Sequence, residues 1–299
     1  MSAVAQPREK REISIDTAPP VNVVQTVKDV REALALPRSS GSVIGLVPTM
    51  GALHPGHEAL IGGARRECGI VVVSIFVNPL QFGPNEDYAR YPRTLEKDVE
   101  ICRRQGTDVV FNPSPDEMYP LPPLTFAEVT RVSEHLCGKF RPGHFRGVAT
   151  VVLKLFNIVR PDRAYFGEKD MQQLAVIRRM VADLNIPVEI AAVPTVREPD
   201  GLAISSRNQH LNSAERKAAP VLYRALEEAV KRIRSGERDA SKVREAAIAI
   251  LESEPLVRIE YLEIVDPTEI QPLSTISGPV RIAAAVWIGG TRLIDNVAV

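Results

Sequence analysis

The chain has no net charge, little cysteine and no long apolar run, and each absence excludes a class of protein. Its 37 Lys and Arg residues balance 37 Asp and Glu residues, whereas a protein that coats nucleic acid needs an excess of basic charge. Its three cysteines are widely spaced and suggest neither a disulfide framework nor a paired-cysteine zinc motif. No apolar run approaches the roughly 20 residues that cross a bilayer. A local basic pocket for phosphate is still compatible with zero net charge.

The first twenty residues are polar and lack the apolar stretch of a signal peptide. Their acidic residues also argue against a transit peptide. We therefore expect a flexible tail over residues 1–20, and a cytoplasmic protein whose cysteines stay reduced and buried.

The 299 residues fit one large domain and one smaller domain. Over 21–195, short Val- and Ile-rich runs alternate with amphipathic segments, which is typical of a parallel sheet with helices on both faces. Strands are expected at 43–47, 70–77, 108–111, 163–166 and 188–193. Helices are expected at 55–67, 94–105, 147–159 and 171–185, with a capping box at Thr94. The predicted fold is α/β and doubly wound, and such sheets bind ligands at the carboxyl ends of their strands.

The pattern changes after about residue 195. Two amphipathic helices are expected at 213–235 and 240–253. Strands joined by Pro and Gly turns are expected at 257–265, 279–287 and 291–297. The segment 196–299 is therefore predicted to form a smaller α+β domain with an antiparallel sheet.

The first segment with chemical character is PTMGALHPGH, which follows an apolar strand and opens a helix. Gly51 and Gly56 allow close approach of backbone to a ligand, and Pro55 suits the first helical turn. The helix N-terminus offers free N–H groups to a phosphate. His54 and His57 are three residues apart, so both can face one anion and stabilise a leaving pyrophosphate. The alternative is a histidine pair that caps the helix or binds a metal.

The second segment, SIFVNPLQF, ends a buried strand with two amide side chains, Asn78 and Gln81. Amides can orient a hydroxy acid without adding charge. Turn formation alone explains Asn78 before Pro79, so Gln81 is the more informative residue.

The third segment, RPGHFRG, places Arg141 and His144 on a Pro-Gly loop before an apolar helix. Contact with an anion and a solvated loop are equally good explanations of this pattern.

The fourth segment, FGEKDMQQ, again joins a strand end to a helix. Lys169 is expected at the carboxyl end of the strand, where its ammonium can reach phosphate oxygens. Either Gln172 or Gln173, in the first helical turn, can point back at the site. A surface ion pair of Lys169 with Glu168 or Asp170 is the alternative.

The fifth segment, DGLAISSRN, lies at the expected domain boundary. The hydroxyls of Ser205 and Ser206 and the guanidinium of Arg207 could hold phosphates together. A helix cap or a linker is the alternative.

These five segments, together with YPRT at 91–94, closely resemble the pantothenate synthetases, or pantoate–β-alanine ligases, in order and spacing. The motifs cover about 43–208, and the closing segment RLIDN at 292–296 also resembles the family. It implies a Rossmann-like nucleotidyltransferase domain related to class I aminoacyl-tRNA synthetases. It also implies that ATP and pantoate give pantoyl adenylate and pyrophosphate, after which β-alanine displaces AMP to give pantothenate. Mg²⁺ accompanies ATP, and a homodimer is expected to form through the first domain.

The resemblance also assigns roles to residues. It gives His57 as catalytic acid with His54 beside it, and we add Lys169 and Arg207 as catalytic cations. The ATP contacts it implies are Met50, Gly51, Ala52, Leu53, His54, Pro55, Gly56, His57, Gly167, Glu168, Lys169, Asp170, Val196, Ile204, Ser205, Ser206 and Arg207. The pantoate contacts are Gln81, Gln173, Asn78, Arg141 and His144, and Gln81 also lies near β-alanine.

The departures from the family pattern are small. Ile204 and Pro55 differ from the commonest family residues at positions that flank the chemistry. Lys97 replaces a residue that is acidic in many relatives, which weakens any metal role for Asp98, and the protein ligands of Mg²⁺ stay unknown.

Two other functions share parts of this pattern. A nucleotidyltransferase that transfers AMP or CMP to a phosphate would carry the same HxGH motif, and a pantoate-dependent pyrophosphate exchange would exclude it. A nucleotide-binding scaffold without catalysis is the second, and AMP release with β-alanine would exclude it.

The chemistry itself requires cations, because a carboxylate and a polyphosphate repel each other. The second domain is expected to shield the reactive adenylate from water, moving as a lid about the Pro199–Gly201 region.

Overall fold

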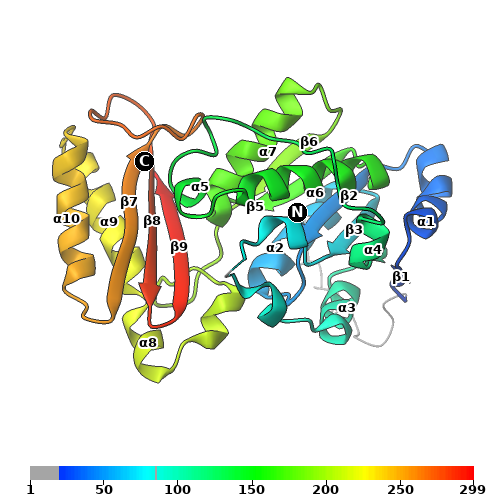
Figure 1. The fold of residues 1–299 in the computed structure, drawn as a ribbon, viewed down its shortest axis with the longest axis horizontal. Helices are drawn as coiled ribbons and strands as arrows, with labels where there is room; N and C mark the ends of the chain where they lie inside the picture. The colour runs from blue at the N-terminus through cyan, green and yellow to red at the C-terminus, as the bar shows by residue number, and fades with distance from the viewer. Residues whose placement is uncertain (1–19, 85) are drawn as a thin grey trace, which may run out of the picture.

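The computed structural model describes residues 20–84 and 86–299, so the tail expected over 1–20 lies outside the described residues except for Pro20. Figure 1 shows two halves side by side, one built on a large sheet with helices around it and one on a small sheet backed by α9 and α10. The large sheet has six parallel strands in the order β1-β4-β3-β2-β5-β6. The predicted α/β fold with a Rossmann-like parallel sheet is thereby confirmed.

The first half alternates strands and helices along the chain. Its strands are β1 (Asn22–Val24), β2 (Ile44–Thr49), β3 (Ile70–Ile75), β4 (Val109–Phe111), β5 (Arg163–Gly167) and β6 (Glu189–Val193). Its longer helices are α1 (Val27–Ser39), α2 (Pro55–Glu67), α3 (Leu95–Arg104), α6 (His144–Val159) and α7 (Met171–Asp183). Its single-turn segments are η2 (Pro79–Gln81), η3 (Asp87–Arg90), α4 (Pro115–Met118), α5 (Cys137–Phe140) and η4 (Glu168–Asp170).

The strands are apolar on both faces because helices cover both faces of the sheet. Leu46 packs in the core that α1, α6 and α7 share, whereas its neighbour Val47 packs in a separate core with residues of α2 and α3. Val72 and Val73 divide between the same two cores. This division follows from the period of two along a strand. It explains why the strands read as continuous Val and Ile runs.

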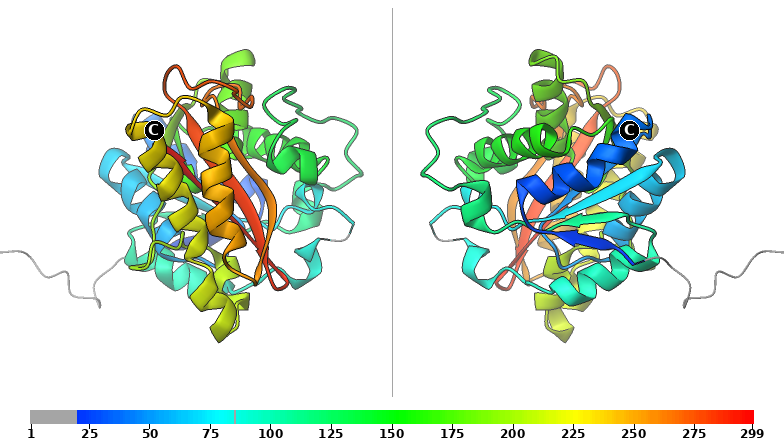
Figure 2. Two further views of the ribbon diagram at one scale, coloured as in Figure 1. Left: turned by 90° about the vertical axis from the view of Figure 1, so that its left-hand side faces the viewer. Right: turned by 90° about the vertical axis from the view of Figure 1, so that its right-hand side faces the viewer.

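The second half is an antiparallel sheet covered on one side by helices. Strands β7 (Val257–Val265), β8 (Arg281–Ile288) and β9 (Thr291–Ala298) pair in the order β7-β8-β9. Helices α9 (Val221–Arg234) and α10 (Ala240–Glu252) pack against this sheet around a core of their own. Two shorter segments, η5 (Ser206–His210) and α8 (Ser213–Ala218), connect the halves. Figure 2 shows α9 and α10 side by side over the small sheet.

The structure corrects three of the sequence predictions. The helix expected over 213–235 is two helices, because Pro220 between them has no N–H to continue the ladder. Thr94 makes no side-chain cap, and its hydroxyl donates to the Asp98 carboxylate at 3.3 Å instead. The helix expected from 147 already begins at His144.

Two elements near the start of the described chain were not predicted. Strand β1 pairs with β4 at the edge of the sheet, and α1 follows it with Thr26 as its cap. The spacing of the buried residues Val30 and Leu34, with Thr26 before them, is a helix signal that the sequence contained.

None of the helices in the described part of the chain is both long and apolar enough to cross a membrane.

Candidate active site

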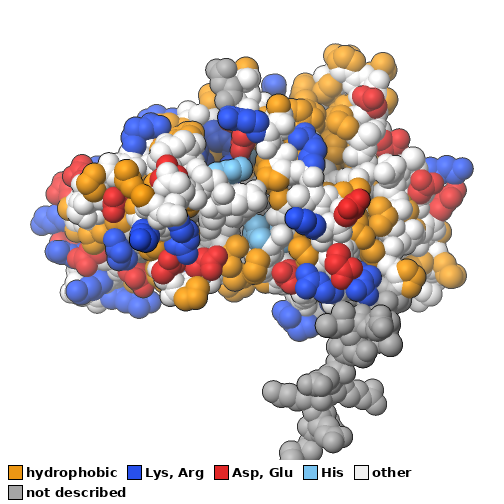
Figure 3. All heavy atoms as spheres, turned by 90° about the horizontal axis from the view of Figure 1, so that it is seen from below, with side chains coloured by type: hydrophobic (Ala, Val, Ile, Leu, Met, Phe, Trp, Pro, Cys, Tyr) orange, Lys and Arg blue, Asp and Glu red, His pale blue; other side chains and the backbone are white. Residues whose placement is uncertain are grey.

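The sheet order brings the ends of three strands together. Strand β2 lies between β3 and β5, so the loops that follow these three strands meet at one edge of the sheet. The chain moves to one side of β2 for β3 and β4 and returns to its other side for β5. This arrangement is a topological switch point, where open α/β sheets bind ligands. A cleft of about 1430 Å³, partly open to solvent, lies there. Histidine side chains are visible near the middle of the face in Figure 3.

Most of the sequence-predicted site residues line this cleft, although they come from five distant segments. The predicted residues in its lining are Met50, His54, Gly56, His57, Gln81, Arg141, His144, Gly167, Lys169, Asp170, Gln173, Val196, Ile204, Ser205, Ser206 and Arg207. Among the described residues, the predicted contacts Gly51, Ala52, Leu53, Pro55, Asn78 and Glu168 are not part of that lining.

The loop between β2 and α2 is held from behind by a buried carboxylate. Ala52 and Leu53 donate their backbone N–H groups to the two oxygens of Asp98, at 3.0 and 2.8 Å. Gly51 and Ala52 both have positive φ angles, of 82° and 51°, and Ala52 is strained there because it carries a Cβ. Asp98, only 1% exposed, therefore fixes a bent loop whose N–H groups turn away from the cleft.

From the sequence alone, Asp98 has no role beyond a weakened metal role. Its position three residues after Leu95 and four before Cys102 places it on the buried stripe of α3, and a carboxylate on an apolar stripe is a signal the sequence contained. The Asp98 carboxylate accepts hydrogen bonds from the backbone N–H groups of the loop and from the Thr94 hydroxyl. This arrangement gives it a structural role in shaping the loop before His54.

The two histidines lie against each other at the start of α2, with ring centroids 4.0 Å apart. His54 caps the helix, and its Nδ1 accepts the N–H of Gly56 at 3.2 Å. The Nδ1 of His57 accepts the N–H of His54 at 3.3 Å. Because both Nδ1 atoms accept, each neutral ring carries its proton on Nε2. The histidines are therefore a helix cap, as one alternative held, and they also line the cleft.

Burial and nearby positive charge keep both rings uncharged. Burial, with a smaller contribution from Lys169, lowers the pKa of His54 to about 4. Burial, followed by the neighbouring His54 and then Lys169, lowers the pKa of His57 to about 3. At neutral pH the pair is thus a set of hydrogen-bond donors and not a pair of cations.

The amide pair after β3 divides into a ligand-facing residue and a supporting residue. Asn78 is 1% exposed and donates to Gln81 Oε1 at 3.2 Å and to the Gly147 carbonyl at 3.1 Å. Its own oxygen accepts from Tyr119 at 2.9 Å. Gln81 lines the cleft and touches Met50 Sδ. Asn78 thus orients Gln81 and does not itself face the cleft.

The side chains of Arg141 and His144 both contact the backbone carbonyl oxygen of Gln81. Arg141 makes a two-pronged ion pair with Glu86, at 2.9 and 2.5 Å, and its Nη1 lies 3.2 Å from His144 Nε2. His144 Nδ1 lies 2.8 Å from the Gln81 carbonyl oxygen and therefore carries the ring proton. Burial and the Arg141 charge lower the pKa of His144 to about 4. Both side chains border the cleft, but their polar atoms are engaged with the protein.

The segment after β5 places Lys169 in the cleft. Its side chain is 19% exposed, and its ammonium lies 3.9 Å from the Asp170 carboxylate. Glu168 turns the other way and pairs with Arg281 of β8 at 3.0 Å. Gln173 faces the cleft, whereas Gln172 is buried and bonds to backbone atoms of Val132, His135 and Cys137.

The last segment brings Arg207 to the cleft from the connection between the halves. Ser205 caps η5 by accepting the N–H of Arg207 at 3.3 Å. The Arg207 guanidinium is paired with Asp87, with N–O distances of 3.1 to 3.3 Å. Asp87 was not expected from the sequence, because its partner lies 120 residues away.

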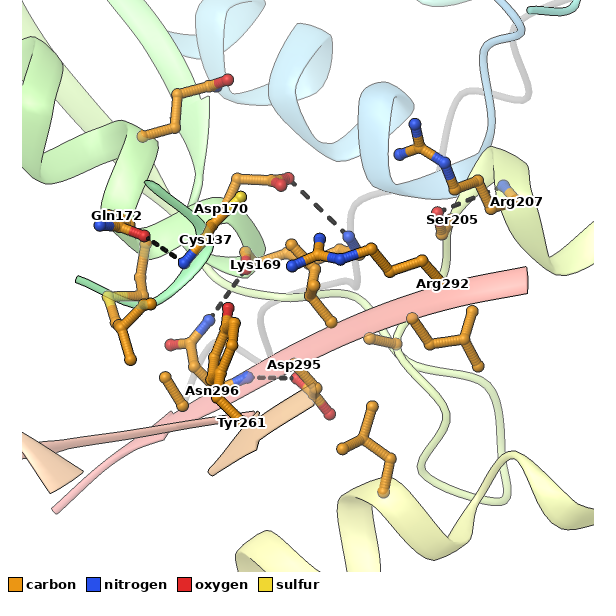
Figure 4. A pocket seen from close by; sticks show the side chains of 18 of the residues that line it. Cys137, Lys169, Asp170, Gln172, Ser205, Arg207, Tyr261, Arg292, Asp295 and Asn296 are labelled. Carbon is orange, nitrogen blue, oxygen red and sulfur yellow. Dashed lines mark hydrogen bonds and ion pairs between the residues drawn. The ribbon is translucent and has the colours of Figure 1, made fainter. Parts of the chain in front are cut away.

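A second pocket of about 810 Å³, partly open to solvent, adjoins the cleft between the two halves. The residues that line both are Arg141, His144, Lys169, Asp170, Gln173, Ser205 and Arg207. Figure 4 shows side chains of β9 entering this pocket opposite Lys169 and Asp170.

Among residues 20–84 and 86–299, no group of three or more His, Cys, Asp or Glu side chains is placed to hold a metal ion. The carboxylates nearest Arg207 and Arg141, Asp87 and Glu86, are already paired with those cations. Asp170 is the acidic residue that remains beside Lys169 in the cleft.

Comparisons with known proteins agree over almost the whole chain. A family model described as pantoate-beta-alanine ligase matches residues 22–298. The pantothenate synthetase of Pelotomaculum thermopropionicum is 55% identical over 274 residues, which are 92% of this chain and 97% of that relative.

Solved structures give the same result. The pantothenate synthetase of Thermus thermophilus superposes with a TM-score of 0.88 at 50% identity, over 93% of this chain and 99% of that one. The pantoate-beta-alanine ligase of Francisella tularensis, solved in complex with beta-gamma ATP and beta-alanine, gives a TM-score of 0.75 at 37% identity, over 93% of this chain and 97% of that one. The resemblance inferred from the sequence motifs is confirmed, and this chain belongs to the pantoate–β-alanine ligase family.

Proposed function

We propose that this protein condenses pantoate with β-alanine in an ATP-dependent reaction that forms pantothenate, AMP and pyrophosphate. The observation that carries the proposal is the meeting of two imidazoles, Lys169 and Arg207 in one cleft beside the amides of Gln81 and Gln173. Cations and N–H donors suit a polyphosphate, and neutral amides suit a hydroxy acid. Family membership and the nucleotide-bound relative support the same reaction.

In the first step, a pantoate carboxylate oxygen attacks the α-phosphorus of ATP. The bond from that phosphorus to the bridging oxygen breaks, and pyrophosphate leaves with the electron pair. Lys169 and Arg207 would balance the negative charge that builds up on the leaving group. The two Nε2–H groups of His54 and His57 would donate to phosphate oxygens. As the bound polyphosphate raises the pKa of these rings, His57 would approach the acidic role implied for it.

In the second step, the amine of β-alanine attacks the acyl carbon of pantoyl adenylate. The C–O bond to AMP breaks, AMP leaves as its phosphate anion, and the nitrogen gives up its extra proton as the amide forms. The main work of the protein in both steps is to hold the reacting atoms in line, because acid and amine carry their own nucleophiles. Gln81, oriented by Asn78, lines the cleft and would contact both pantoate and β-alanine.

Magnesium would enter as a complex with ATP. Mg²⁺ commonly keeps several waters and binds through substrate phosphates and one or two carboxylates. The carboxylate of Asp170 beside Lys169 fits that mode and not a site made by the protein alone. When bound, the ion would neutralise phosphate charge.

We propose a domain boundary between residues 195 and 196 and a lid role for 196–299. Arg197 forms a two-pronged ion pair with Asp295 of β9, at 2.6 and 2.9 Å, so the chain is attached to the second sheet from that point on. Gly201 lies in the Pro199–Gly201 region about which the lid is expected to move. Its φ is 90°, and a Cβ there would lie 2.3 Å from Tyr223, so this position requires glycine. If ATP left the domain angle and the hydrogen exchange of Ser205–Arg207 unchanged, the lid role would be wrong.

A homodimer through the first domain, in the cytoplasm, completes the proposal. Leu121 and Leu124 are 77% and 95% exposed on a loop of that domain, and Phe126 is also exposed. Apolar side chains grouped on a surface favour a protein partner. The three cysteines are free and buried, which suits a reducing compartment. A sizing measurement tests the dimer.

The test of the reaction is AMP production with ATP, pantoate and β-alanine, omitting one substrate at a time. AMP production should require all three substrates. Exchange of pyrophosphate into ATP should require pantoate but not β-alanine. Lys169→Ala should reduce pantoyl adenylate formation by several orders of magnitude while the fold stays intact. Single-turnover adenylate formation at the wild-type rate in that variant would contradict the role of Lys169.

A further inference from the structure

Strand β9 belongs to the second sheet, yet one of its side chains reaches the catalytic loop of the first. The carboxamide of Asn296 donates one N–H to the carbonyl of Glu168 at 2.8 Å and the other to the carbonyl of Lys169 at 2.9 Å. Asn296 is 4% exposed. Figure 4 shows this side chain directed from β9 to the backbone at Lys169.

The orientation of the carboxamide is settled by its neighbours. Two carbonyl oxygens face its nitrogen, and the guanidinium of Arg281 donates to its oxygen at 3.0 Å. Arg281 also pairs with the side chain of Glu168 at 3.0 Å. Two residues of the small sheet therefore bind Glu168, the neighbour of Lys169. Asn296 binds its backbone carbonyl and Arg281 binds its carboxylate.

Local structure alone holds this loop weakly. Glu168, Lys169 and Asp170 form a single 3₁₀ turn, and Gly167 before it supplies no side-chain cap. Such a short turn has poor hydrogen-bond geometry of its own. The two bonds from Asn296 end on consecutive carbonyls, on either side of the Lys169 Cα. They restrict the direction in which the lysine side chain leaves the backbone.

We propose that Asn296 is a positioning residue for Lys169, so that the second domain supplies part of the nucleotide site and is more than its cover. The proposal rests on the phosphate-binding role of Lys169 in the proposed function. The proposal assigns a role in positioning Lys169 to the last residue of the RLIDN segment, to which the reaction scheme assigns no role. It also means that domain closure must carry the Glu168–Lys169 loop along or break these two bonds.

The experiment compares Asn296→Ala in the wild-type and Lys169→Ala backgrounds. In the wild-type background, Asn296→Ala should lower kcat for pantoate-dependent pyrophosphate exchange by about ten- to a hundredfold, the effect of a small misplacement of a catalytic group. The KM for pantoate should change little. In the Lys169→Ala background it should have no further effect. ATP affinity is measured in the same four proteins, so that the comparison does not depend on residual turnover.

Asn157→Ala is the matched control, because Asn157 donates a similar bond to a backbone carbonyl at 2.9 Å on an exposed face of α6. It should leave exchange unchanged. If Asn296→Ala does not fold, as judged by thermal unfolding, Arg281→Gln takes its place and should give a smaller loss of kcat with the same dependence on Lys169.

Two results would overturn the inference. One is wild-type kcat in a folded Asn296→Ala protein, and the other is an equal fold-loss with and without Lys169, which would indicate a general structural role. Wild-type exchange by Lys169→Ala alone would instead count against the proposed function, so the two failures can be told apart.

Discussion

The ion pair between Arg207 and Asp87 leads to a specific prediction about ATP binding. Arg207 faces the cleft where the polyphosphate is proposed to bind, but in the free protein a carboxylate already lies 3.1 to 3.3 Å from its guanidinium. The phosphates of ATP must therefore compete with Asp87 for that cation. Asp87→Asn removes the competing charge and keeps the shape of the side chain.

The exposure of the pair sets the size of the effect. The side chains of Arg207 and Asp87 are 32% and 33% exposed, so solvent screens much of their attraction. Ion pairs of this kind contribute about 0.2–1 kcal/mol. Because about 1.4 kcal/mol corresponds to a tenfold change in affinity, Asp87→Asn should tighten ATP binding by about 1.4- to 5-fold. Removing a carboxylate near the phosphates acts in the same direction.

Calorimetric titration with ATP measures this change directly. The matched control is Asp183→Asn, which removes an acid from the exposed Arg179 pair on α7, where the N–O distance is 2.8 Å. Affinity for ATP should be unchanged in the control. The difference between Asp87→Asn and wild type should shrink at high salt, because added ions screen the competing pair.

Three results would refute the reasoning. Unchanged or weaker ATP binding by a folded Asp87→Asn protein would show that Asp87 does not compete with the nucleotide. Equal tightening by Asp183→Asn would reduce the effect to net charge. Insensitivity of the difference to salt would show that it does not arise from an exposed ion pair.

Further predictions follow from the same cleft. Gln81→Ala should weaken pantoate binding far more than ATP binding in separate titrations, and equal losses would argue against its role. Asp98→Ala removes a buried acceptor of two backbone N–H groups. It should lower the free energy of unfolding in urea by about 3–6 kcal/mol, since each of the two bonds to the charged group contributes about 1.5–3 kcal/mol. A loss below about 1 kcal/mol would contradict the geometry. The lowered pKa values of His54 and His57, about 4 and 3, predict that stability is full above about pH 6.5 and falls as the pH drops toward 3, because the unfolded chain takes up protons first. Unfolding measured across that range should show a shallower fall in His57→Gln, and an identical pH profile would count against the burial of the pair.

The candidate site could be predicted from the sequence down to its segments and to most of the residues that line the cleft, but not to the contacts that orient their side chains. The strand ends, the glycines and the cationic residues marked the five segments as candidates, each with a structural alternative, and in the structure residues of all five line one cleft. The residue pattern left the choice between Gln172 and Gln173 open, because both lie in one helical turn, and only the family resemblance favoured Gln173. In the structure, the carbonyls of Val132 and His135 bind Gln172, and Gln173 lines the cleft.

The sequence by itself determined the order of most strands and helices, because periodicity, turn residues and caps depend on neighbours a few positions apart. It left out β1 and α1 and merged α8 with α9. It also determined which loops carry the cationic and amide side chains of the motifs, and hence the family. Only the tertiary structure decided that Asp98 shapes the loop before His54, that Asp87 occupies Arg207 and that Asn296 grips the backbone at Lys169. Each of these contacts joins residues 45 to 127 positions apart. No local pattern encodes such a pairing, because it exists only once the strands are arranged in their sheet order.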